Sequence, residues 1–109
     1  MNLENVVSQS VFLLIEANPN PNPNQKEALQ DYLTKAPAIT AEHGAVLVAR
    51  YNIETALDGG EKSALFAVMS FPDRQAVDNL FNDPKYKALI PSRDLGFSSI
   101  RFFIGTEKI

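Results

Sequence analysis

Apolar residues recur in this chain with two different periods, every second residue in some stretches and every third or fourth residue in others. Residues 45–71 are the organising stretch, because two runs rich in β-branched and aromatic residues flank the turn Asp58-Gly59-Gly60. Such runs around a glycine-bearing turn are typical of a β-hairpin. Compact apolar runs of strand length also lie at residues 9–17 and 99–105. The pattern therefore predicts four strands.

A helical pattern fills the interval between the first strand and the hairpin. Its apolar stripe consists of Ala28, Leu29, Tyr32, Leu33, Ala36 and Ile39. Asn24 and Glu27 are expected to form a capping box at its start, and Gly44 a left-handed cap at its end after His43. Pro37 should kink or split this helix, because proline has no N–H to donate to the carbonyl one turn earlier.

Two further helices are predicted between the hairpin and the last strand. Asp73 is the expected cap of the first, whose buried face is Ala76, Val77, Leu80 and Phe81. Asp83 is expected to cap a short helix that begins at Pro84, because proline fits the first position of a helix. Pro91 should end that helix, and a loop should lead from it to the last strand.

The predicted order is strand, helix, strand, strand, helix, strand. This is an α+β order whose usual solution is the ferredoxin-like βαββαβ fold, a four-stranded antiparallel sheet with helices on one face. At 109 residues, one domain over 1–109 is expected, with a polar lead-in at 1–8. Residues 18–24 alternate Asn and Pro, which favours an extended Asn/Pro linker. A rigid connector is one interpretation of this segment, and a lid or recognition segment is the other.

The predicted strands are apolar on both faces, although a sheet covered on one side only should alternate apolar and polar residues. One uniformly apolar set is assigned to the helices: Val11, Leu13, Ile15, Leu65, Ala67, Met69, Phe71, Ile100, Phe102 and Ile104. The other set includes the polar residues Glu16, Arg50, Glu54, Ser70 and Arg101. Large exposed apolar patches mark interfaces. We therefore predict that a second copy covers this face in a two-fold homodimer, with a mixed polar and apolar cavity between the sheets.

Composition and charge narrow the function classes. The chain has 10 basic and 13 acidic residues, a net charge of −3 and no basic block, so nucleic-acid binding is not expected. No apolar run approaches the ~20 residues that span a membrane. The start of the chain lacks a secretory signal, so a cytoplasmic location is expected. Because the chain has no cysteine and one histidine, no disulfide, metal site or cofactor is predicted.

A group of residues also carries a family resemblance. They are Tyr32 with Pro37, His43-Gly44, Ala49-Arg50, Leu57-Asp58-Gly59, Phe71-Pro72, Ala76, Asp83-Pro84-Lys85-Tyr86-Lys87-Ala88-Leu89 and Arg93. With them, the stretch from Tyr32 to Arg93 resembles the domain-of-unknown-function family numbered 1330, in the dimeric α+β barrel superfamily. The resemblance implies a small homodimeric barrel without an established activity. It also implies that Arg50 and Arg93 match two arginines of the family.

Six residues are candidates for binding a small molecule: Arg50, Arg93, Tyr86, Glu16, Ser70 and His43. The two arginines are suited to hold a carboxylate or phosphate in a bidentate fork, or else they pair with Glu16, Glu54 or a carbonyl. The Tyr86 hydroxyl either orients a ligand or bonds a nearby backbone group. His43 either interacts with the dipole at a helix C-terminus or acts as a general base.

Three functions remain open at this point. The first is a homodimeric protein that binds a small acidic or aromatic organic molecule in a mixed pocket. The second is a cofactor-free enzyme, oxygenase- or isomerase-like, that acts on a small organic acid, lactone or aromatic compound. The third is a structural or interaction protein without a ligand. The sequence alone does not decide whether the protein is an enzyme, since one fold supports many functions.

Overall fold

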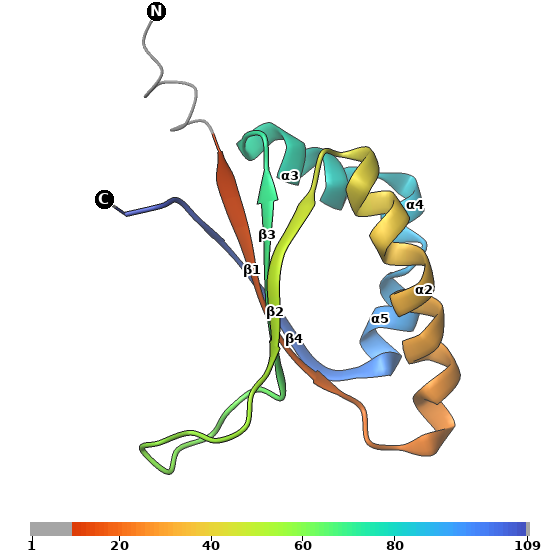
Figure 1. Ribbon diagram of the computed structural model, residues 1–109. Helices are drawn as coiled ribbons and strands as arrows, with labels where there is room; N and C mark the ends of the chain where they lie inside the picture. The colour runs from red at the N-terminus through yellow and green to blue at the C-terminus, as the bar shows by residue number, and fades with distance from the viewer. Residues whose placement is uncertain (1–9, 109) are drawn as a thin grey trace, which may run out of the picture.

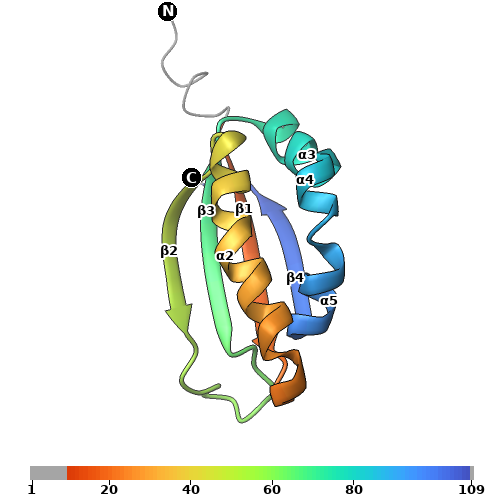
Figure 2. The same ribbon diagram turned by 90° about the vertical axis from the view of Figure 1, so that its right-hand side faces the viewer.

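The computed structural model describes residues 10–108, and the polar lead-in predicted for residues 1–8 lies outside them. The elements in chain order are β1 (Val11–Pro19), the 3-10 helix η1 (Pro23–Gln25), α2 (Lys26–Glu42), β2 (Val46–Asn52), β3 (Leu65–Phe71), α3 (Arg74–Asn82), α4 (Pro84–Lys87), α5 (Ile90–Gly96) and β4 (Phe97–Gly105). The strands form one sheet in the order β2-β3-β1-β4, and every neighbouring pair is antiparallel. All the helices lie on one face of this sheet (Figures 1 and 2). The predicted ferredoxin-like α+β fold is confirmed.

The face of the sheet toward the helices carries the core. In the register of the sheet, Val11 lies beside Phe71 and Leu13 beside Met69, so these side chains share that face. Phe71 packs there with Val77 and other buried residues of the helices. Full burial of one such large side chain is worth about 1.5–3 kcal/mol. The uniformly apolar set of strand residues was therefore assigned to the correct face.

The opposite face of the sheet, which we call the open face, has no element of residues 10–108 packed on it (Figure 1). In the register of the sheet, Phe12 lies beside Ser70, and Leu14 lies beside both Val68 and Phe103, so these side chains share the open face. Phe103 is 38% exposed although it lies in the last strand. The open face is thus an apolar surface with isolated polar groups, as the strand pattern predicts.

Arg50 does not lie on the open face, and this part of the prediction is wrong. Strand β2 carries a bulge between Leu47 and Ala49, after which Arg50 is the partner of Ala67 on the helix face. An extra residue reverses the alternation of a strand, because side chains have a period of two. In a regular strand, Arg50 would share the open face with Val46, which pairs with Ser70.

The Asn/Pro segment is shorter and better fastened than the sequence predicts. Strand β1 continues to Pro19, and η1 begins at Pro23, so the irregular connector is confined to residues 20–22. Asn22 caps η1, since its side chain accepts from the backbone N–H of Asn24. Helix α2 starts after Gln25, which makes no side-chain cap hydrogen bond, so the predicted capping box of Asn24 and Glu27 is not formed. The side chain of Asn20 donates to the carbonyl of Leu95 at 3.0 Å. The connector is therefore held against the end of α5.

Two prolines behave differently from the prediction. Helix α2 runs unbroken through Pro37, and the Thr40 hydroxyl donates to the Pro37 carbonyl at 2.9 Å. Pro91 does not end a helix; it lies in the first turn of α5, where the missing N–H costs nothing. The stretch expected to be a loop from Pro91 to the last strand is therefore helical, and it carries Arg93.

The predicted caps and the hairpin turn have the expected local geometry. The Asp73 side chain accepts from the amide of Ala76 at the start of α3, and Asp83 caps α4. Gly44 and Gly59 have φ values of +81° and +75°, the left-handed region that favours glycine. The hairpin strands end earlier than predicted, so residues 53–64 form a long loop between β2 and β3.

Candidate functional site

A pocket of about 350 Å³ opens between the helix face of the sheet and α2, and a second hollow of about 310 Å³ adjoins it. The two hollows share the residues Ile15, Tyr32, Leu47, Arg50 and Phe102. We treat them as one pocket because these five residues line both hollows. The volume falls in the range of about 300–1,000 Å³ that is usual for small-molecule sites.

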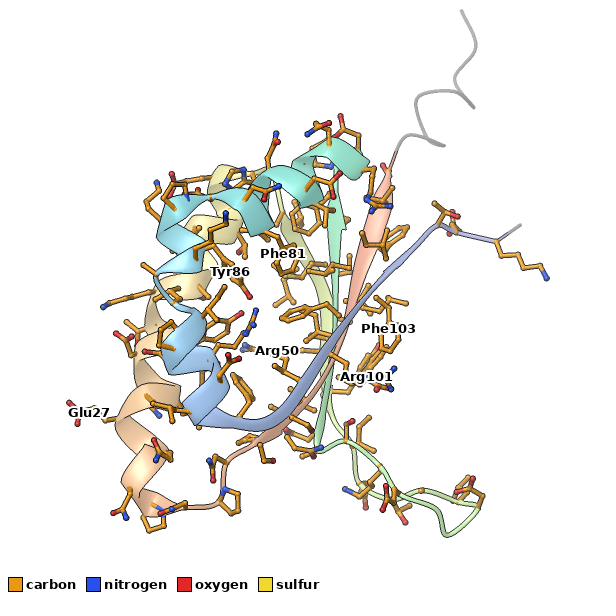
Figure 3. All side chains as sticks on the ribbon, turned by 180° about the vertical axis from the view of Figure 1, so that it is seen from behind. Glu27, Arg50, Phe81, Tyr86, Arg101 and Phe103 are labelled. Carbon is orange, nitrogen blue, oxygen red and sulfur yellow. The ribbon has the colours of Figure 1, made fainter. Side chains whose placement is uncertain are left out.

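Arg50 brings a positive charge into this mainly apolar pocket. The bulge in β2 turns its side chain toward the helices, where Figure 3 shows it between the sheet and the helical layer. Among residues 10–108, the Arg50 guanidinium takes part in no ion pair and no side-chain hydrogen bond. The structural pairing with Glu16 or Glu54 that the sequence left open is therefore not made. A planar guanidinium without a partner is suited to hold a carboxylate.

Two tyrosines form a hydrogen-bonded pair beside Arg50. The hydroxyl oxygens of Tyr32, on α2, and Tyr86, on α4, lie 2.8 Å apart. The two residues are 8% and 1% exposed. Arg93 Nη1 donates to the Tyr86 hydroxyl at 3.2 Å, and Arg93 Nε donates to Asp94 at 3.2 Å. Tyr86 therefore bonds side chains rather than the backbone group that the sequence suggested.

Burial keeps the Tyr32 hydroxyl protonated. Removal from water raises the pKa of the Tyr32 hydroxyl far above its usual value, and the neighbouring Tyr86 raises it further. Tyr32 consequently keeps its O–H hydrogen at neutral pH. The Arg93 guanidinium opposes this rise only weakly.

Aromatic rings hold these groups in place. Tyr32 packs edge-on against Phe97 with ring centres 5.7 Å apart, and Phe81 packs edge-on against Tyr86 at 5.1 Å. Phe81 also contacts Phe102 edge-on at 5.2 Å. Such pairs add about 0.5–1.5 kcal/mol beyond their buried area. The pocket wall is thus a rigid aromatic cluster, suited to a flat apolar ligand body.

His43 lies outside the residues that line the pocket. It is the cap residue at the end of α2, and its Nε2 lies 2.8 Å from Oδ2 of Asp83, the cap residue at the start of α4. This hydrogen bond lowers the pKa of the Asp83 carboxyl, and the amide of Lys85 lowers it further. The His43–Asp83 contact therefore ties the ends of two helices together.

Glu16 and Ser70 also lie outside the pocket, because both side chains belong to the open face. Glu16 pairs across the sheet with Phe66 and Arg101, and its Oε2 lies 4.0 Å from Nη1 of Arg101. Arg101 extends over the ring of Phe103 at 4.7 Å, and Figure 3 shows both on the side away from the helices. No other part of residues 10–108 encloses this polar group.

The predicted site residues are therefore divided between the two sides of the sheet. Arg50 and Tyr86 line the same pocket, and Arg93 supports Tyr86 from α5. Sequence reasoning did not choose Tyr32 or Phe102 as site residues. Tyr32 sat within an apolar helical stripe, and the only signal was that a buried tyrosine hydroxyl needs a polar partner.

Within residues 10–108, no three or more His, Asp or Glu side chains are grouped so that they could hold a metal ion. No helix there is long and apolar enough to cross a membrane.

Fold and pocket together define a class of protein, the ferredoxin-like α+β proteins with a helix-covered pocket and one open sheet face. A family model described as Domain of unknown function (DUF1330) matches residues 20–104. The chain belongs to this family, as its resemblance from Tyr32 to Arg93 implies. No curated protein matches the sequence.

Solved structures share the fold. The RPA0582 protein of unknown function from Rhodopseudomonas palustris superposes with a TM-score of 0.81 at 17% identity, covering 94% of this chain and 85% of that one. SnoaB, a cofactor-independent oxygenase from Streptomyces nogalater, gives 0.63 at 10% identity, with 93% and 95% covered. A nipsnap family protein of unknown function from Agrobacterium tumefaciens gives 0.62 at 12% identity, with 92% and 89% covered. Identities this low establish the fold alone.

Proposed function

We propose that this protein is a homodimer that binds a small organic anion with an apolar or aromatic body in the pocket between the sheet and α2. One observation carries the binding proposal: the guanidinium of Arg50 faces an apolar pocket and has no carboxylate partner within residues 10–108. Arg50 is an exposed residue, so a ligand can reach its guanidinium from solvent, and the apolar walls strengthen the attraction between charges relative to water alone. A ligand carboxylate is the natural partner for this group.

The proposed contact has a measurable size. A hydrogen bond to a charged group contributes about 1.5–3 kcal/mol, which corresponds to roughly 10–100-fold in affinity. The aromatic walls supply the rest of the binding energy by covering the apolar body of the ligand. An acid should therefore bind better than its neutral amide.

The test is calorimetric titration with 3-phenylpropanoate and with its neutral amide. The wild type should prefer the acid, and Arg50→Gln should lose that preference together with roughly 10–100-fold of the acid's affinity. Arg74→Gln is the matched control, because Arg74 pairs with Asp78 on the surface of α3. Equal binding of the acid by wild type and Arg50→Gln would refute the proposed role of Arg50.

The homodimer is supported by the open face and by the loop at its end. Leu14 and Phe103 occupy the open face, where no element of residues 10–108 covers them, and covering the apolar surface that they still expose would be favourable. The β2–β3 loop extends on the same side of the sheet (Figure 1), and its Leu57 is 98% exposed. A second copy placed face to face would cover both surfaces.

Native mass spectrometry tests the dimer directly. The chain weighs 12.0 kDa, so the proposal predicts a species of twice that mass. Extra mass on that species would indicate a ligand retained through purification. A species of single mass at micromolar concentration would contradict the dimer but leave the pocket of each chain in place.

A cofactor-free enzyme acting on a small organic acid, lactone or aromatic compound is the second candidate. The observation that favours it is the buried Tyr32–Tyr86 pair beside the pocket, together with a fold shared with the oxygenase SnoaB. Turnover of such a compound should fall strongly in Arg50→Ala. His43→Ala should retain it, since His43 is tied to Asp83 outside the pocket. Turnover unchanged in Arg50→Ala would rule this version out.

A further inference from the structure

The hydrogen atoms of the tyrosine pair do not all have acceptors in the protein. Two phenols carry two O–H hydrogens, and the single bond between Tyr32 and Tyr86 uses one of them. Arg93 supplies a further N–H to the Tyr86 oxygen. Within residues 10–108, neither hydroxyl makes another hydrogen bond. One O–H is therefore left to donate to whatever occupies the pocket.

The contact with Arg93 decides which hydroxyl keeps the unused hydrogen. A hydroxyl whose oxygen accepts from a cation becomes a stronger donor, because neighbouring hydrogen bonds polarise one another. The polarisation by Arg93 favours Tyr86 as the donor to Tyr32, an arrangement that leaves the Tyr32 hydrogen available. Tyr32 lines both hollows of the pocket, whereas Tyr86 lines only the second. The available donor is thus on a residue that lines both hollows.

We infer that the pocket takes an oxo acid, whose carboxylate binds Arg50 and whose carbonyl oxygen accepts from the Tyr32 hydroxyl. This inference rests on the proposed function and adds a second anchor to it. A carbonyl oxygen only accepts hydrogen bonds, so it matches the Tyr32 hydroxyl, whose oxygen already accepts from Tyr86 and whose hydrogen is left to donate. Arg93 and Tyr86 act as positioning residues, since Arg93 donates to Tyr86 and Tyr86 in turn orients the Tyr32 hydroxyl.

Two matched pairs of acids separate this inference from the proposed function. Phenylpyruvate differs from 3-phenylpropanoate, and 4-oxo-4-phenylbutanoate from 4-phenylbutanoate, by one keto oxygen. The pairs place that oxygen at two distances from the carboxylate. In calorimetric titration of the wild type, the oxo acid of at least one pair should bind about tenfold more tightly than its partner.

Tyr32→Phe should remove this preference, so that each oxo acid binds no more tightly than its partner without a keto group. Tyr51→Phe is the matched control, because Tyr51 also lines the pocket but its hydroxyl lies outside the hydrogen-bonded pair, and this variant should keep the full preference. With the keto carbon labelled with ¹³C, the bound oxo acid should show a downfield shift in the wild type. Tyr32→Phe should abolish that shift. If Tyr32 had only a structural role, the shift would remain in this variant.

The outcomes are distinguishable. Equal binding of oxo and plain acids by the wild type, or a preference that survives in Tyr32→Phe, overturns the inference. If all four acids bind and all weaken in Arg50→Gln, the proposed function stands even when the keto preference is absent. If none of the four acids binds at millimolar concentration, both the proposed function and this inference fail. Far-ultraviolet circular dichroism of each variant confirms that it is folded.

Discussion

Gly96 is the position where one added methyl group should disturb both the stability and the site. It is buried at the end of α5, where the chain passes against α2. A Cβ built there would lie 2.6 Å from the Cα and 2.8 Å from the N of Leu29. These are backbone atoms and cannot rotate away. The two helices must therefore separate by about 0.8 Å to bring the closest approach to 3.4 Å, where ordinary van der Waals contact begins.

The expected cost of Gly96→Ala follows from this contact. Overpacking of a close-packed site costs about 1–3 kcal/mol. Alanine regains up to ~1 kcal/mol over glycine within a helix, and less at the last residue of one. We expect a net loss of roughly 1–2 kcal/mol in the free energy of unfolding, which lowers Tm by about 5–15 °C for a protein of this size.

The assay is urea unfolding followed by far-ultraviolet circular dichroism. Gly105→Ala is the matched control, since its Cβ would meet only Leu14 Cδ1 at an ordinary 3.6 Å. That control should change stability by less than about 0.5 kcal/mol. The affected contact lies one turn from Tyr32 on α2 and one turn from Arg93 on α5. Gly96→Ala should therefore also weaken oxo-acid binding. If the free energy of unfolding of this variant equals that of the wild type, the reasoning is refuted.

Three more predictions concern the open face, the helix-end contact and the core. Phe103→Glu places a charge in the proposed interface and should shift the native mass from twice to once 12.0 kDa; a retained dimer would argue against this face. Asp83→Asn tests the pH dependence of stability. The hydrogen bond with His43 lowers the pKa of the Asp83 carboxyl in the folded protein. The stabilisation by this carboxylate is therefore present above the unfolded-state pKa of about 3.9 and is lost as the pH falls through the lower folded-state pKa. The stability difference from wild type should thus shrink below about pH 4 in urea titrations, and a difference unchanged at pH 2 would contradict it. Phe71→Ala should cost about 3–5 kcal/mol in the same assay, and a loss below 1 kcal/mol would show that this site is not the packed core.

Much of the fold could be predicted because its local signals agree with its packing. Strands β1, β3 and β4 keep a period of two over the residues of the apolar set, so the pattern predicts the correct face for that set. Aspartate is a preferred residue just before a helix, because its side chain can accept from the first backbone N–H groups. Asp73 and Asp83 both cap helices in this way. These are short-range effects, and a single sequence contains them.

The errors come from features that short-range signals do not contain. The bulge in β2 falls within Val46-Leu47-Val48-Ala49, which has no glycine to mark it, and it moved Arg50 to the other face. Pro91 was read as a helix end, although proline is equally at home in a first turn. The direction of Arg50 decides where the pocket lies, so one extra residue changed the predicted site.

The tyrosine pair was missed for a related reason. Its hydroxyls come from helices 54 residues apart in the sequence, and only the packing of α2 beside α4 and α5 brings them together. The sequence predicts that Tyr32 is buried, because it lies on an apolar helical stripe. It does not predict which polar group the hydroxyl meets, since that depends on tertiary structure.

The most direct test of the proposed pocket is a crystal structure of the protein with 4-oxo-4-phenylbutanoate bound. We predict the ligand between the sheet and α2, its carboxylate on the Arg50 guanidinium and its keto oxygen within hydrogen-bond distance of the Tyr32 hydroxyl. The same crystal would show whether a second copy covers Phe103. A ligand bound against the open face near Glu16 and Ser70, with Arg50 turned away from it, would contradict the pocket and the role given to Arg50.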